Sequence, residues 1–229
     1  MNTPARTRIK ICGLTREADV DAAVAAGADA IGFVLYPRSP RHVSAAQAGR
    51  LARRLPPFVT PVLLFVNAAA PDILAAVEQV PDALLQFHGD ESPADCARLA
   101  DAAHRRWIRA ARIPADPGAR FDLVNFATEF TAAQAILLDA QVDGYGGGGK
   151  AFDWSLLPPS VNAHLVLSGG LTPSNVGDGI RLLRGRGRSL AVDVSSGVEL
   201  DGPGHKGLKD AGKIQRFVAA VRAADSLSD

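Results

Sequence analysis

The sequence predicts an α/β protein: one (β/α)8 barrel spanning residues 1–229, built on an eight-stranded parallel sheet. Short apolar runs rich in β-branched residues alternate with longer helical stretches, the pattern of parallel strands joined by helices. The unit recurs eight times, at a spacing of roughly 25–30 residues, and 229 residues suit a small barrel. A doubly wound sheet, which usually has fewer units, remains the structural alternative.

The first half of the chain supplies four strand–helix units with recognisable helix signals. The helix over 17–26 is expected to stop at Gly27, a natural C-terminal stop. Ser44 can cap the next helix, and Pro93 takes the first helical position after Ser92. The expected strands are 9–12, 30–35, 61–66 and 83–88, and the expected helices are 17–26, 44–55, 71–80 and one opening at 92–93.

The second half continues the alternation with shorter elements. The expected strands are 107–110, 135–139, 164–167 and 190–194, and the expected helices are 119–126, 152–157, 173–183 and 210–223. We find no linker, low-complexity run or change of composition, so the chain is interpreted as one domain.

Charge and cysteine content narrow the classes of function. A net charge of +1, without a basic face or acidic tail, argues against nucleic acid or membrane surfaces as partners. The start of the chain lacks the apolar core of a signal peptide, and no apolar run is long enough to span a bilayer. Two distant cysteines, Cys12 and Cys96, form no disulfide framework. A reducing cytoplasm, which keeps a functional thiol free, is therefore expected.

In such barrels the chemistry lies at the C-terminal ends of the strands, and alternation decides which side chains point inward. Lys10 and Cys12 share one face of the first strand, with the intervening isoleucines facing the helices. Leu137 and Asp139 likewise share a face of the sixth strand. An inward carboxyl is costly unless it is paired or functional, so Asp139 is a candidate catalytic residue.

Other polar side chains are expected at the same end. Gln86 and His88 share a face of the fourth strand, the loop after the second strand carries Arg38 and Arg41, and the eighth strand ends near Asp193. Cys96 is expected to be structural, and the acidic stretch 90–95 to be a solvated loop surface.

Two glycine-rich turns predict a phosphate site. A barrel's phosphate site commonly uses the loops after strands 7 and 8 and the start of a short extra helix. Here those loops read LSGGLT and DVSSGVE, and a short helix near 195–197 would aim its amide groups at the same point. The phosphate candidates are Gly169, Gly170, Ser195 and Ser196.

These motifs together resemble phosphoribosylanthranilate isomerase of tryptophan biosynthesis. The resemblance covers nearly the whole chain in the right order: KICGLT, GFVLYPRSPRHV, LLQFHGDE, LLDAQVDGYGGGGKAFDW, LSGGLTPSNV and VDVSSGVE. Two features depart from the family pattern: Gly148 stands where threonine is usual, and PGHKGLKD leaves open which of Lys206 and Lys209 matches the family lysine.

The resemblance implies an Amadori rearrangement of a phosphorylated aminosugar, N-(5′-phosphoribosyl)anthranilate, in which the sugar ring opens and a Schiff base becomes an aminodeoxyribulose phosphate. It implies Cys12 as general base and Asp139 as general acid, without metal or organic cofactor. Arg41 would pair with the anthranilate carboxylate, and Gln86 and His88 would hydrogen-bond the sugar or amine. The chain is expected to be a monomer or homodimer.

Three alternatives stay open. Another phosphosugar barrel, such as indole-glycerol-phosphate synthase or a ring-opening isomerase of histidine biosynthesis, would need different residues at the strand ends. A catalytically silent barrel would only bind a phosphorylated ligand or a protein. The segment 144–151 nearly matches a nucleotide-binding P-loop, but Ala151 replaces the hydroxyl residue that binds Mg²⁺.

Overall fold

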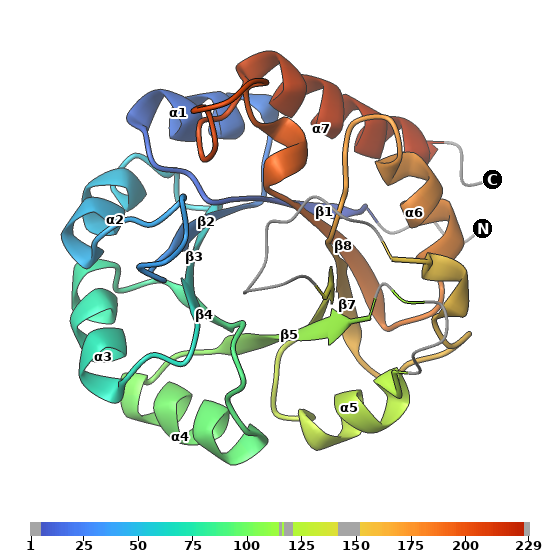
Figure 1. Ribbon diagram of the computed structural model, residues 1–229, viewed down its shortest axis with the longest axis horizontal. Coiled ribbons are helices and arrows are strands. Elements are labelled where there is room, and N and C mark those ends of the chain that lie inside the picture. The colour runs from blue at the N-terminus through green and yellow to red at the C-terminus, as the bar shows by residue number, and fades with distance from the viewer. Residues whose placement is uncertain (1–5, 115, 117–120, 142–151, 227–229) are drawn as a thin grey trace.

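The computed structural model describes residues 6–114, 116, 121–141 and 152–226. Eight parallel strands pair in sequence order, and the last pairs with the first to close a barrel. Figure 1 shows the strands as a central ring with the helices around its outside. The predicted barrel is therefore confirmed. Closure excludes the doubly wound sheet, which has two open edges.

Most elements begin and end close to their predicted positions. The strands are β1 Arg8–Cys12, β2 Ala30–Val34, β3 Thr60–Phe65, β4 Leu84–Phe87, β5 Trp107–Ile113, β6 Ile136–Ala140, β7 His164–Leu167 and β8 Ser189–Val194. The helices are α1 Glu17–Ala26, α2 Ala45–Ala52, α3 Ala70–Gln79, α4 Pro93–Ala103, α5 Leu123–Glu129, α6 Val176–Leu183 and α7 Ala211–Ser226. Within the described residues, no helix has the length and apolar character needed to cross a membrane.

The largest departures lie on either side of β6. Helix α5 begins at Leu123, later than predicted, because the side chain of Asp122 caps it by accepting a hydrogen bond from Asn125 N at 2.9 Å. The described part of the connection from β6 to β7 contains only the short 3-10 helix η1, Trp154–Leu156, where a helix over 152–157 is predicted. The glycine-rich segment 144–151 lies outside the described residues.

The helix signals act as predicted. Ser44 Oγ accepts a hydrogen bond from Gln47 N at 3.2 Å, and Ser92 Oγ accepts one from Asp95 N at 3.1 Å. Gly27 closes α1 at a φ of 93°, a left-handed conformation that a side chain would disfavour. Local signals therefore fix where these helices begin and end.

The core lies mainly between the strands and the surrounding helices. The outward residues of β1 and β6 belong to this layer: Ile9, Ile11, Ile136 and Leu138. The inward Leu137 packs inside the barrel with Ile108 and Ala110, and the inward Cys12 packs in a separate small cluster. The predicted alternation is thus confirmed for both strands, and burial of each large apolar side chain contributes about 1.5–3 kcal/mol.

Candidate active site

Cys12 is the last residue of β1 and lies buried on the inward face, at the end of the barrel where chemistry is expected. It packs with Val34, Leu64 and Val66. The adjacent strand carries Gly32, where a Cβ would lie 2.6 Å from the Cys12 sulfur. Glycine on β2 therefore leaves the room that this thiol occupies.

Asp139 belongs to a buried row of three hydrogen-bonded side chains, all of them predicted site residues. His88 Nε2 lies 3.0 Å from Asp139 Oδ2, and Gln86 Nε2 lies 3.0 Å from His88 Nδ1. Because an amide nitrogen only donates, His88 Nδ1 accepts, which leaves the proton on Nε2 to be donated to Asp139. Gln86 Oε1 is buried and has no hydrogen-bond partner within the described structure.

The Cys12 sulfur lies beside a buried pair of charges. Lys10 Nζ is 2.7 Å from Asp193 Oδ1, and Ser168 Oγ donates to Asp193 Oδ2 at 3.2 Å. Burial raises the pKa of the Cys12 thiol, whereas the positive charge of Lys10 lowers it. The sulfur is therefore more readily protonated than an ordinary thiol.

Arg41 is held by a carboxylate that sequence reasoning missed. Glu199 accepts hydrogen bonds from Arg41 Nε at 2.6 Å and from Nη2 at 3.0 Å, a bidentate pair. Lys209 Nζ lies 3.0 Å from Glu199 Oε1 and 3.2 Å from Ser195 Oγ. Burial lowers the pKa of Lys209, and the Glu199 carboxylate opposes this. Lys206 is exposed, so Lys209 is the lysine that reaches the site.

The two predicted phosphate loops pack against each other. Gly169 and Gly170 have φ values of 73° and 64°, which turn the chain through the left-handed region after β7. Ser195 follows β8, and Ser196 begins the short 3-10 helix η2, Ser196–Val198, near its predicted place. A Cβ on Gly197 would collide with the backbone of the loop after β7. Close contact of the loops therefore requires glycine there.

Glycines also connect these loops to the two candidate catalytic groups. A Cβ on Gly13, the residue after the cysteine, would lie 2.5 Å from Arg41 Cδ and 3.1 Å from Ser195 Oγ. A Cβ on Gly169 would lie 3.0 Å from Asp139 Oδ1. The two candidate phosphate loops therefore border Asp139 on one side and the turn after Cys12 on the other. No hydrogen bond among the described residues joins Cys12 and Asp139 directly.

A further buried ion pair, between Arg109 and Glu91, braces the loop after β4. Glu91 accepts hydrogen bonds from Gly89 N at 2.9 Å, Asn67 N at 2.7 Å and Arg109 Nη1 at 2.9 Å. The expectation that 90–95 is a solvated stretch is wrong at Glu91, which is buried because three donors satisfy its carboxylate. This bracing fixes the turn that follows His88.

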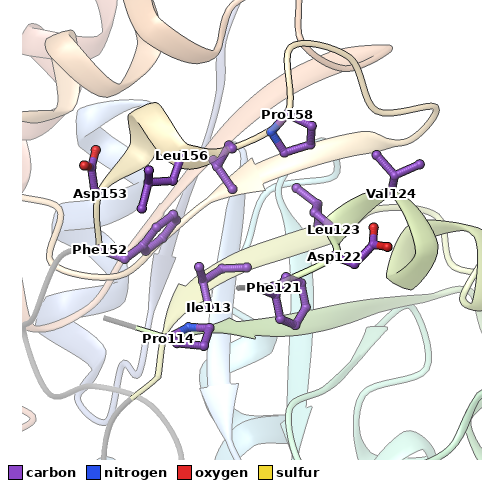
Figure 2. A pocket seen from close by; sticks show the side chains of 11 residues that line it. Ile113, Pro114, Phe121, Asp122, Leu123, Val124, Phe152, Asp153, Leu156 and Pro158 are labelled. Atoms are coloured by element: carbon purple, nitrogen blue, oxygen red, sulfur yellow. The ribbon is translucent and has the colours of Figure 1, made fainter. Parts of the chain in front are cut away.

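A separate cavity of about 620 Å³, lined by both apolar and acidic side chains, is shown in Figure 2. Its walls come from the end of β5, the start of α5 and the segment around η1; Figure 2 shows Ile113, Phe121, Phe152 and Leu156 around it. None of the nine predicted site residues is among its described lining residues.

The comparisons with known proteins identify the family and support the fold. Residues 9–220 match the family model described as N-(5′-phosphoribosyl)anthranilate (PRA) isomerase. An N-(5′-phosphoribosyl)anthranilate isomerase from Leptothrix cholodnii is 64% identical over 226 residues, covering 99% of this chain and 96% of the relative.

Two solved structures are similar over 95% of this chain and 99% of their own. The phosphoribosyl anthranilate isomerase from Thermotoga maritima has a TM-score of 0.79 and 38% identity. A phosphoribosyl anthranilate isomerase in complex with reduced 1-(o-carboxyphenylamino)-1-deoxyribulose 5-phosphate has a TM-score of 0.77 and 35% identity. With its barrel, its strand-end polar groups and these matches, the chain belongs to the phosphoribosylanthranilate isomerase family of tryptophan biosynthesis.

Proposed function

We propose that Cys12 and Asp139 perform the two proton transfers of the Amadori rearrangement that this isomerase catalyses. The observation that carries the proposal is the placement of both groups on inward faces at strand ends, each next to a loop suited to phosphate. A single catalytic domain spanning residues 1–229 would supply every group.

The first transfer opens the sugar ring. The Asp139 carboxyl donates its proton to the ring oxygen, the bond between C1 and that oxygen breaks, and the nitrogen lone pair forms a protonated Schiff base. His88 holds Oδ2 of Asp139, which leaves Oδ1, on the side of Gly169, as the oxygen that carries the acidic proton. General acid catalysis of this kind contributes about 10²- to 10⁴-fold.

The second transfer forms the ketose. The Cys12 thiolate removes the proton from C2, the electrons of that bond form a double bond between C1 and C2, and the Schiff-base nitrogen becomes neutral. The resulting enol then becomes the ketone as its C2 hydroxyl loses a proton and C1 gains one, with no net change in the number of protons. Asp139 has lost a proton and Cys12 has gained one, so exchange with solvent must restore both before the next turnover.

Charge and loop geometry support the binding roles. Gly169, Gly170, Ser195 and Ser196 would hold the phosphate, because backbone N–H groups and hydroxyls can surround an anion there. Arg41 would bind the anthranilate carboxylate, with Glu199 fixing the plane of its guanidinium group.

The remaining substrate contacts involve β4. Gln86 and His88 would hydrogen-bond the sugar or amine, and the unpartnered Gln86 Oε1 suits a donor such as a hydroxyl or amine.

The direct test is turnover of freshly made N-(5′-phosphoribosyl)anthranilate, followed by the loss of its anthranilate fluorescence. Purified chain is expected to convert the substrate at a rate proportional to enzyme concentration. Absence of turnover by folded protein would favour a catalytically silent barrel instead.

The same assay tests whether Arg41 binds the anthranilate carboxylate, with a matched pair of arginine variants. Arg41→Ala is expected to raise KM by roughly 10- to 100-fold, because a hydrogen bond to a charged group contributes about 1.5–3 kcal/mol of ground-state binding. Arg38→Ala removes an exposed arginine from the same loop and should leave KM unchanged. Equal KM values for both variants would assign Arg41 another role.

We propose that the partner of this site is a small phosphorylated aminosugar, and that the protein binds neither nucleic acid nor membranes. The chain is proposed to be a monomer or a homodimer; one solved relative from Thermotoga maritima is described as a dimeric enzyme from which monomers were generated. We place the enzyme in the cytoplasm, because a reducing compartment keeps Cys12 and Cys96 as the free thiols found here. Cell fractionation tests this location.

A further inference from the structure

We propose that Lys10 is a positioning residue for the proton transfer at Cys12: its ammonium group, held by the Asp193 carboxylate, stabilises the thiolate that takes the proton from the sugar. This inference rests on the proposed role of Cys12 as the base and deepens it.

The fold brings the three groups to one place. Lys10 precedes Cys12 by two residues on β1, so strand alternation turns both side chains to the barrel interior. Asp193 is the register partner of Lys10 on β8, and the distance from Nζ to Oδ1 is 2.7 Å. The side chains of Lys10 and Asp193 are only 7% and 6% exposed, so the pair is withdrawn from water.

Packing alone gives no reason for charges at this position. Removing two ions from water costs several kcal/mol each, and apolar side chains of similar volume often serve stability equally well. Other inward positions carry apolar side chains, among them Ile108, Ala110 and Leu137, or polar groups of the proposed site such as His88 and Asp139. A buried charged pair beside the thiol, which packing does not require, therefore indicates a chemical role.

The charges that face the sulfur come from β1, β8 and the segment before α7. Burial raises the pKa of Cys12 most strongly; Lys10 lowers it by charge and as a hydrogen-bond donor, Asp193 raises it, and Lys209 lowers it. Val34, Leu64 and Val66 pack with it as apolar neighbours, and the partly buried Tyr36 packs against the same cluster. Burial disfavours the ammonium of Lys10 itself, but Asp193 more than compensates and raises the pKa of Lys10, so the lysine stays charged.

Removing the charge of Lys10 and removing that of Asp193 should change the pKa of Cys12 in known directions. Without the Lys10 charge, the thiol would ionise only at still higher pH, and less thiolate would be present at any pH below its pKa. Without the Asp193 charge, the ammonium would have the Cys12 thiolate as its remaining buried partner, and ionisation would begin at lower pH. Lys10 and Asp193 should therefore move the pKa of Cys12 in opposite directions.

The test measures thiolate formation without substrate, by site-resolved mass spectrometry of iodoacetamide alkylation across a range of pH. Lys10→Met is expected to raise the apparent pKa of Cys12 by about 1 or more, which slows alkylation about tenfold at a fixed lower pH. Asp193→Asn is expected to lower it. Cys96 serves as an internal control, because burial raises its pKa to about 12 and it should stay unlabelled in every folded variant.

A double variant separates the charge effect from damage to the fold. Lys10→Met alone leaves a buried carboxylate unpaired, which can destabilise the barrel. The double variant Lys10→Met/Asp193→Asn is therefore compared with Asp193→Asn. The two differ only by the lysine, and neither contains an unpaired buried carboxylate at residue 193. The pKa of Cys12 should be higher in the double variant than in Asp193→Asn.

Equal pKa values in those two variants would overturn the proposal, as would shifts of the same sign in Lys10→Met and Asp193→Asn. Because alkylation needs no turnover, this result is independent of whether Cys12 is the catalytic base. An active Cys12→Ala enzyme would contradict the proposed function while leaving the measured effect of Lys10 on the thiol intact.

Discussion

Replacing Cys12 by alanine is expected to lower kcat by about 10²- to 10⁴-fold, because it removes the thiol that we propose accepts the proton from C2. KM should change little, since the thiol acts in the transition state and does not anchor the substrate. The variant should fold, because Cys12 contributes one small side chain to its apolar cluster and its loss costs on the order of 1 kcal/mol. Steady-state kinetics with a thermal unfolding curve measure both effects.

Cys96→Ala is the matched control for that experiment. Cys96 is also buried but lies on α4, among the side chains that pack helices against the barrel. It should retain kcat while losing similar stability. If Cys12→Ala kept near-normal kcat, or both variants lost activity equally, the thiol would not be the base.

Replacing Asp139 by asparagine is expected to lower kcat to a similar extent, about 10²- to 10⁴-fold. The amide keeps the shape of the carboxyl, and its oxygen can still accept the hydrogen bond from His88 Nε2. It has no acidic proton for the ring oxygen, so ring opening should fail while substrate still binds. Single-turnover fluorescence, which separates binding from reaction, measures this directly.

Asp72→Asn supplies the control for the loss of a carboxylate, because Asp72 is exposed on α3, outside the proposed site. Its kcat should equal that of the unaltered chain. A raised KM with normal kcat in Asp139→Asn would instead assign Asp139 to substrate binding.

Local rules predicted the parts of this structure that depend on neighbours along the chain. Alternation along β1 and β6 placed Cys12 and Asp139 inward, and the signals at Ser44, Ser92 and Gly27 located helix ends, because each rests on contacts within a few residues. The start of α5 was misplaced, since its cap, Asp122, competes with several other polar residues in a stretch of weak periodicity.

The buried charges could not be predicted in the same way. Glu199 and Lys209 lie in loops after β8, and Arg41 reaches them from the loop after β2, 158 residues away from Glu199 in sequence. Arg109 on β5 meets Glu91 in the loop after the neighbouring strand β4. The neighbouring sequence does not show whether a charged loop residue will be buried against a distant partner or will stay on the surface. These pairs therefore become visible only in the closed barrel.

The central claim is that one sugar lies between the Cys12 sulfur and the Asp139 carboxyl. A crystal structure of this protein with a reduced product analogue, of the kind bound to a relative, tests it most directly. Cys12 Sγ should lie within about 3.5 Å of C2, and Asp139 should contact the hydroxyl derived from the ring oxygen. A ligand with its phosphate on the glycine and serine loops but either group out of reach of the sugar would contradict the account.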